Sequence, residues 1–331
     1  MEHPFAQYIQ ILGKGKQGSR DLTQDEAEQA LTMILSGQAE PVQLGAFLML
    51  MRVKEEAPAE VAGFVKAARA SLSLPANLPA VDLDWASYAG KRRQLPWYLL
   101  SALLLSSHGA AVLMHGTGGI AGRVCVPQAL EALGLKPASS LQEAAQQIAQ
   151  KSFSFLPLAV LNQEMLRMLN LKELLGLRSP IHTVIRMLNP FAAPASIMGI
   201  FHPGYDEIHQ QAALLLQDKQ LVVFKGEGGE AERNPDAPCK IRLVQNGQAI
   251  NEEWPALFNS RHLRDETMDI SRLAKLWRGE IDDEYGKAAV VSTAAIALRA
   301  MGQANSIAEA GALAAKLWET RDIGYLERVK G

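Results

Sequence analysis

One short stretch of the sequence combines cations with aromatic rings. Its cations are Lys91, Arg92 and Arg93, and its rings are Trp85, Tyr88 and Trp97. Phosphates bind cations while unpaired bases stack on rings, so this combination suits a nucleic acid recognised without sequence preference. We expect the stretch to follow a strand, at the sheet edge where ligands of α/β proteins bind. A solvated surface run is the alternative interpretation.

Further cations are spaced so that they could extend this contact with phosphate. They are Lys14, Lys16 and Arg20 in one glycine-rich segment, and Arg272 and Lys275 on one face of a predicted helix. Residues 13–18 also fit a dinucleotide-binding pattern, but a helix rather than a strand is predicted before them. We therefore expect a flexible basic loop there. For Arg272 and Lys275 the alternative is an ordinary surface helix.

A second glycine-rich segment follows a predicted buried strand. It consists of His115, Gly116, Thr117 and Gly118, and its backbone amides could approach an anion closely. It is not a Walker loop, because no Lys-Ser or Lys-Thr pair follows it. A tight structural turn is the alternative.

Residues suited to catalysis are scarce. Glu230 and Glu232 lie in a glycine-rich loop and could hold Mg²⁺ through oxygen ligands, although a solvated acidic loop is the favoured interpretation. The histidines form no zinc-protease motif, and no nucleophile-elbow motif occurs. The sequence therefore nominates no nucleophile and no resident cofactor or metal.

Composition narrows the possible locations and partners. The 331 residues carry 33 Lys and Arg against 35 Asp and Glu, so any site for a polyanion must be a local cluster. Cys125 and Cys239 are too few for a disulfide framework and lack zinc-ligand spacing, which predicts reduced thiols and a cytoplasmic protein. Polar residues and a proline interrupt the longest apolar run, so we expect no membrane span.

The elements that must position these residues change in character near residue 75. In residues 1–75 apolar positions recur every three or four residues, which predicts a small helical bundle. Thr23 and Glu26 have the spacing of a helix-capping box. Residues 76–331 alternate short apolar runs with helical patterns, which predicts an α/β domain with a parallel sheet. The predicted strands cover residues 80–83, 111–114, 152–155, 196–201 and 221–224.

The order of several motifs resembles that of anthranilate phosphoribosyltransferase over nearly the whole chain. These motifs are residues 22–28, 34–37, 43–49 and 52–54 in the helical part, His115-Gly116 followed by residues 130–134, and residues 175–178 followed by Asn189-Pro190. The resemblance implies a helical domain, joined by helices from about 165–190, plus a larger α/β domain. It also implies dimerisation through the helical part.

The resemblance further implies that the active-site motifs have changed. Where the family has its glycine-rich pyrophosphate loop, residues 85–89 place bulky rings, which we expect to block the cradle for phosphoribosyl pyrophosphate. The family's lysine and asparagine near the second motif are Met114 and Thr117, and its substrate-binding arginine is Lys172. The acidic pair that holds magnesium falls near Glu230, with one member missing. These losses together argue against transferase activity.

Cations gather near the same face. They are Lys91, Arg92, Arg93, Arg123, Lys172, Arg178 and Arg186. One branch of the family that is similar in fold is associated with nucleic-acid binding, which implies a homodimer with a basic groove. We therefore expect a homodimer, not an enzyme, that binds DNA or RNA without sequence preference. The alternatives are a Mg²⁺-dependent phosphoribosyltransferase acting on an aromatic or nucleobase acceptor, and a protein-interaction module.

Overall fold

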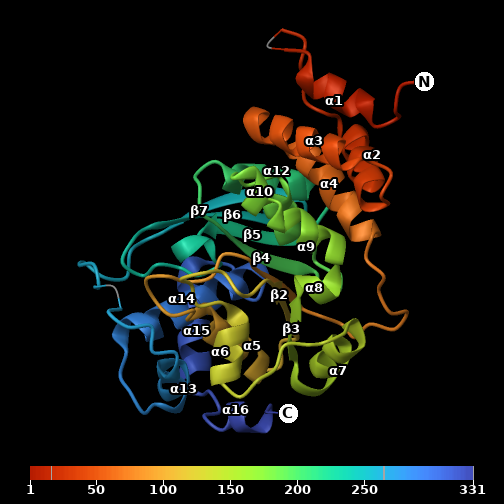
Figure 1. Ribbon diagram of the computed structural model, residues 1–331. Coiled ribbons are helices and arrows are strands. Elements are labelled where there is room, and N and C mark those ends of the chain that lie inside the picture. Colours follow the sequence, from red (N-terminus) through yellow and green to blue (C-terminus); the bar gives the residue numbers. More distant parts are fainter. Residues whose placement is uncertain (16, 264, 331) are drawn as a thin grey trace.

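The computed structural model describes residues 1–15, 17–263 and 265–330. Four N-terminal helices form a bundle beside the larger domain (Figure 1): α1 (Ala6–Gly13), α2 (Gln24–Leu35), α3 (Pro41–Lys54) and α4 (Pro58–Ala70). The predicted capping box starts α2, because Thr23 Oγ1 accepts from the Glu26 amide at 3.2 Å and Glu26 Oε2 accepts from the Thr23 amide at 2.8 Å. The bundle and a larger α/β domain make up the predicted fold class.

A seven-stranded sheet forms the centre of the α/β domain, in the order β3-β2-β1-β4-β5-β6-β7. Its parallel strands are β1 (Leu83–Ser87), β2 (Val112–Gly116), β3 (Phe153–Pro157), β4 (Ala195–Ile200) and β5 (Gln220–Lys225). The chain runs outward from β1 to β3 and then returns to the other side of β1 as β4. Ligands of open α/β sheets bind at the carboxyl ends of strands where the order reverses in this way.

The five predicted strands are all present, with β1 displaced toward the C-terminus of the predicted segment. The antiparallel hairpin of β6 (Cys239–Gln245) and β7 (Gln248–Trp254) was not predicted. Its turn is Asn246-Gly247, with φ values of 53° and 74°, which is the backbone that a two-residue hairpin needs. The hairpin signal was therefore present in the sequence.

Helices cover both faces of the sheet (Figure 1). One face carries α5 (Tyr98–Ser107), α6 (Val126–Ala132), α13 (Ser271–Arg278), α14 (Glu284–Ala300), α15 (Ile307–Glu319) and α16 (Tyr325–Arg328). The other carries the N-terminal bundle, α7 (Leu141–Lys151), α8 (Leu158–Leu161), α9 (Gln163–Asn170), α11 (Ile181–Val184), η1 (Ile185–Met187) and α12 (Tyr205–Leu215). None of the helices in the described ranges has the length and apolar character to cross a bilayer.

Candidate functional site

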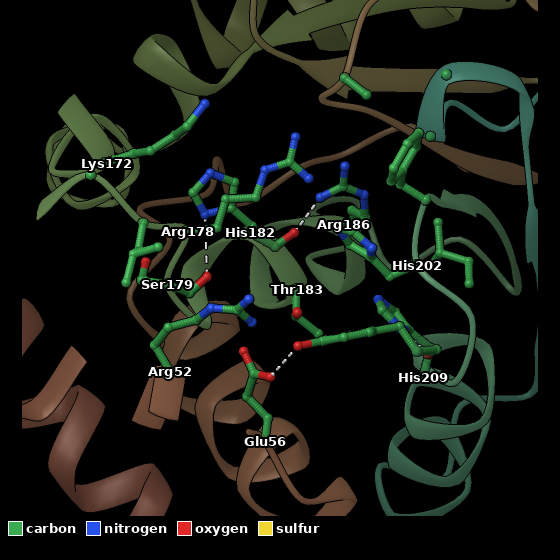
Figure 2. A pocket seen from close by; sticks show the side chains of 18 residues that line it. Arg52, Glu56, Lys172, Arg178, Ser179, His182, Thr183, Arg186, His202 and His209 are labelled. Carbon is green, nitrogen blue, oxygen red and sulfur yellow. Dashed lines mark hydrogen bonds between the residues drawn. The ribbon is translucent and has the colours of Figure 1, made fainter. Parts of the chain in front are cut away.

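A cavity of about 290 Å³ lies at the carboxyl end of β4, where the sheet meets the helical bundle. Its walls come from parts of the chain that are distant in sequence (Figure 2). They are Arg52 of α3 and Glu56 just after it, residues between 172 and 186 around α10 (Lys172–Leu175) and α11, residues 200–202 at the end of β4, Tyr205 and His209 of α12, Ala89 after β1, and Gly228 and Gly229 of η2 (Glu227–Gly229). We call this space the interdomain cavity.

Four cationic side chains reach the interdomain cavity: Arg52, Lys172, Arg178 and Arg186 (Figure 2). Among the described residues, no carboxylate oxygen lies within 4 Å, the ion-pair distance, of a side-chain nitrogen of these four residues. Arg186 is held by backbone carbonyls instead, since its Nε donates to the Gly199 carbonyl at 3.2 Å and its Nη1 to that of His182. Burial lowers the pKa of Arg178 and of Arg186, and neighbouring arginines lower both further, while Glu230 opposes the shift of Arg186. These cations thus have no ion-pair partner in the described chain.

Two histidines in the cavity wall are held neutral. Burial and nearby arginines lower the pKa of His182 to about 3, and burial lowers that of His209 to about 4. Each Nδ1 faces a backbone carbonyl, of Ser179 at 3.2 Å and of Tyr205 at 2.6 Å. Because a carbonyl can only accept, each Nδ1 carries the proton and each Nε2 is an acceptor.

Two polar atoms in the same wall are buried and have no partner in the described chain: His209 Nε2 and Ser179 Oγ. Buried polar groups in proteins are nearly always hydrogen-bonded, so a ligand or water in the cavity could supply the partners that these two atoms lack. The cavity has one carboxylate in its described wall, Glu56, and it accepts a hydrogen bond from Tyr205 Oη at 2.9 Å. Burial raises the pKa of Glu56. The wall is therefore predominantly cationic.

The loop after β1 is different, because the chain itself supplies an anion there. Glu230 Oε1 accepts from the amide of Ala89 at 2.6 Å and from that of Gly90. The Glu230 side chain is buried, and burial raises its pKa while the two amides oppose this shift. Backbone amides that could cradle a diphosphate are thus already bonded.

A second internal carboxylate occupies the N-terminus of α5. Glu232 Oε2 accepts from the Tyr98 amide at 2.9 Å, and Glu232 Oε1 pairs with the Nζ atom of Lys91. Lys91 also pairs with Glu227 and has no solvent exposure. Burial raises the pKa of Glu232 to about 7 against the opposing effect of Lys91. We call the amides of Ala89, Gly90 and Tyr98, with Lys91, Glu230 and Glu232, the internal cradle.

The internal cradle corrects several predictions. Lys91 was expected to contact phosphate, but it is fully buried and paired. Trp85 and Trp97 have no exposure and Tyr88 has 8%, so the predicted stacking of bases on these rings is wrong. Trp85 stacks instead on Tyr98, with ring centroids 6.4 Å apart. Glu230 and Glu232 bind protein groups rather than solvent.

The second glycine-rich segment is mostly structural. His115 is buried. Its Nδ1 is hydrogen-bonded to Tyr88 Oη at 2.7 Å, and its Nε2 lies 3.3 Å from a carboxylate oxygen of Asp84. A Cβ on Gly116 would lie 1.9 Å from the Ser87 carbonyl, so glycine is required for the close approach of β1 and β2. His115 and Gly116 are therefore not ligand-binding residues. Thr117 is partly exposed and Gly118 is exposed, so they remain candidates.

The remaining predicted cations differ in whether the protein itself supplies a partner. Those with protein partners are Arg20, paired with Glu26 at 2.7 Å, Arg272, paired with Asp265 and Asp283, and Lys275, 4.0 Å from Asp269. Arg123 is half-buried and donates to the carbonyls of Ala89 and Gly90 at 3.0 and 3.1 Å. Lys14, Arg92 and Arg93 are exposed. Lys16 lies outside the described residues.

Sequence reasoning missed several residues of the cavity wall. Arg52, His182, Phe201, His202 and His209 were not among the predicted site residues, whereas Lys172 and Arg178 were. Phe201 ends the predicted strand 196–201 and His202 follows it, so the rule that ligands bind at strand ends could have found them. Arg52, His182 and His209 lie on helices whose sequence patterns carry no such signal.

Comparison with known proteins identifies the family. The family model described as "Glycosyl transferase family, helical bundle domain" matches residues 6–72, and the model described as "Glycosyl transferase family, a/b domain" matches residues 98–320. The chain belongs to this glycosyl transferase family. Within the family it is an anthranilate phosphoribosyltransferase-like protein.

Its relatives include proteins of different description. The chain is 28% identical over 306 residues to an uncharacterized protein of Aquifex aeolicus, covering 89% of this chain and 92% of that one. It is 27% identical to the uncharacterized protein YbiB of Escherichia coli (72% and 76% coverage), and 26% identical to anthranilate phosphoribosyltransferase of Moorella thermoacetica (88% of both chains). The crystal structure of the Thermus thermophilus enzyme shares the fold, with a TM-score of 0.81, 22% identity and coverage of 99% and 98%.

Anthranilate phosphoribosyltransferase from Saccharomyces cerevisiae, which shares the fold with a TM-score of 0.77 at 16% identity, was solved in complex with PRPP and Mg. The residues of the present chain do not fit such a metal. Glu230 and Glu232 are bonded to amides and to Lys91, and of their four carboxylate oxygens only Glu230 Oε2 is without a hydrogen-bond partner, whereas Mg²⁺ takes several oxygen ligands. No three His, Cys, Asp or Glu side chains in the described ranges are arranged to hold a metal ion.

Proposed function

We propose that this protein binds nucleic acid without sequence preference, and that phosphate groups of the polymer enter the interdomain cavity. One observation carries the proposal: Arg52, Lys172, Arg178 and Arg186 reach a single cavity without a carboxylate partner in the described chain. Arg52 and Arg186 are partly buried and Lys172 and Arg178 are exposed, and like charges gathered at one cavity repel one another unless an anion joins them. A polymer of phosphates supplies such anions in series.

Exposed cations outside the cavity would lengthen the contact. Arg92 and Arg93 are exposed, and so is Lys14 on the helical bundle. We further propose the homodimer that the family resemblance implies, because a two-fold axis doubles each basic patch and lets a protein of net charge −2 present a longer basic track. We place this dimer in the cytoplasm, where the buried free thiols of Cys125 and Cys239 stay reduced.

A mobility-shift titration across a salt series tests this function. Unrelated oligonucleotides should bind alike, with a log-log salt slope of about −0.7 per neutralised phosphate on single strands. The double variant Lys172→Ala/Arg178→Ala should weaken binding to all of them and flatten the slope by about 1.4, from two contacts at about 0.7 each. The control Lys136→Ala/Lys219→Ala removes two exposed lysines outside the cavity and should leave the slope unchanged. An unaltered slope in the first variant contradicts the proposal.

A second candidate function is Mg²⁺-dependent phosphoribosyl transfer to an aromatic or nucleobase acceptor. Membership of the glycosyl transferase family and relatives named anthranilate phosphoribosyltransferase favour it. The internal cradle argues against it, because its amides and Lys91 are already bonded to carboxylates. Calorimetry with phosphoribosyl pyrophosphate and Mg²⁺ separates the two, since a working substrate site binds in the range of roughly 1 μM to 1 mM. Absence of heat argues against catalysis.

A further inference from the structure

The size of the interdomain cavity restricts what can enter it. Its volume of about 290 Å³ is at the lower end of small-molecule sites, which occupy roughly 300–1,000 Å³. A DNA duplex is read through grooves about 6–12 Å wide by elements that protrude from a protein, and this site is concave. A single nucleotide, unlike a duplex, matches a space of this size.

The cavity wall contains a hydrogen-bond acceptor as well as cations, and a phosphodiester alone cannot donate a hydrogen bond to it. Arg178 and Arg186 supply positive charge, but His209 Nε2 is an acceptor and needs a donor from the ligand. Each of the four bases has N–H groups on its Watson–Crick edge, and these are free only when the base is unpaired. Phosphate and base together therefore match the two kinds of group in the wall.

The rim of the cavity carries a free aromatic ring. Phe201 is 52% exposed, and its ring lies 5.0 Å from that of His202 in an edge arrangement. Every other Phe, Tyr and Trp side chain in the described residues is at least about two-thirds buried. Aromatic side chains that stand free at a basic site are the stacking platforms of proteins that bind single strands. Phe201 thus takes the role that the sequence suggested for the buried Trp85 and Trp97.

We propose that the interdomain cavity receives one unpaired nucleotide of a single strand, with its phosphate at Arg178 and Arg186 and its base against Phe201. The N–H edge of that base then faces His209 Nε2 in the neutral histidine. This inference rests on the proposed function and deepens it, because it names single-stranded nucleic acid as the substrate class. A duplex would contact the outer cations but could not place a base in the cavity.

Fluorescence anisotropy with a labelled twelve-nucleotide strand and its blunt duplex tests the inference. The wild-type protein should bind the single strand more tightly. Phe201→Ala should weaken single-strand binding about 5- to 150-fold, the range of one lost base stack, and change duplex binding less than about twofold. Because Phe201 is exposed, this variant should keep the wild-type unfolding temperature, and Phe201→Trp should restore single-strand binding. Equal loss for strand and duplex overturns the inference.

A strand of the same length made of abasic nucleotides provides the second arm. It keeps the phosphates and lacks the bases, so it should bind the wild type and Phe201→Ala equally well. If the abasic strand binds the wild type and Phe201→Ala with different affinities, Phe201 does not stack on a base and the inference is wrong. Failure of the proposed function would look different, because neither the single strand nor the duplex would then bind in a salt-dependent manner.

Discussion

The internal cradle and the interdomain cavity are neighbouring basic regions with opposite arrangements of charge. In the cradle, Lys91 and the backbone amides are satisfied by Glu230 and Glu232, within a fully buried network. In the cavity, Arg178 and Arg186 reach open space and have no carboxylate within ion-pair distance among the described residues. Removing one partner of a buried ion pair leaves an uncompensated buried charge and destabilises the fold, whereas a cation that faces a cavity is available for a ligand. The internal cradle is therefore expected to contribute to stability, and the interdomain cavity is the region for which we propose binding.

The largest expected effect is in the internal cradle. Lys91→Met leaves Glu227 and Glu232 as buried carboxylates without their cation, so the variant should lose about 3–5 kcal/mol of unfolding free energy. Urea denaturation followed by circular dichroism measures this loss. Adding Glu232→Gln to Lys91→Met should recover part of it, because the uncompensated charge is then reduced. A loss below about 1 kcal/mol for Lys91→Met would contradict a structural role for the pair.

Much of the fold, but less of the site, could be predicted from the sequence. The capping box at Thr23 and the apolar runs of the parallel strands are local patterns, so their elements were predicted. Lys91 was misinterpreted because its partner Glu232 is 141 positions away, and only the sheet topology brings the two together. A cation next to tryptophans looks the same in a sequence whether its environment is water or a buried carboxylate.

The same limit applies to the cavity wall. Arg178 was predicted from a motif of the family resemblance, but nothing local distinguishes it from paired cations such as Arg272. His209 lies on α12 outside any motif, and its proposed role as a hydrogen-bond acceptor depends on the Tyr205 carbonyl one helical turn away, which holds the proton on Nδ1. Predicting such a site needs the positions of groups that are distant in the sequence.

A prediction of intermediate size concerns acid stability. The pKa of His209 is lowered to about 4 by burial, from an ordinary value near 6.5. Between these values the unfolded chain binds a proton that the folded chain does not, so stability falls as pH drops from about 6.5 to about 4, by up to about 3 kcal/mol for this site. His182 acts in the same direction, whereas Glu232, with its pKa raised to about 7, acts in the opposite one.

His209→Gln should therefore flatten the acid limb of a plot of urea midpoint against pH. The glutamine keeps polar atoms in the wall but has no charge to gain on acidification. His108→Gln is the matched control, because His108 is exposed and should leave the curve unchanged. If both variants give the wild-type slope between pH 4 and 6.5, the neutral state of His209 is not linked to folding.

The smallest expected effect on stability belongs to the interdomain cavity and sharpens the contrast with Lys91. Arg178 has no carboxylate partner in the described residues, and Arg123 and Arg52 lie close enough to lower its pKa after the effect of burial. Arg178→Gln should therefore change the unfolding free energy by less than about 0.5 kcal/mol, with any change toward greater stability, since it relieves repulsion. The same variant should weaken binding of a single strand and lower its salt slope by about 0.7. Lys91→Met should show the reverse pattern, and a destabilised Arg178→Gln with unchanged binding would mean that the cavity cation is structural too.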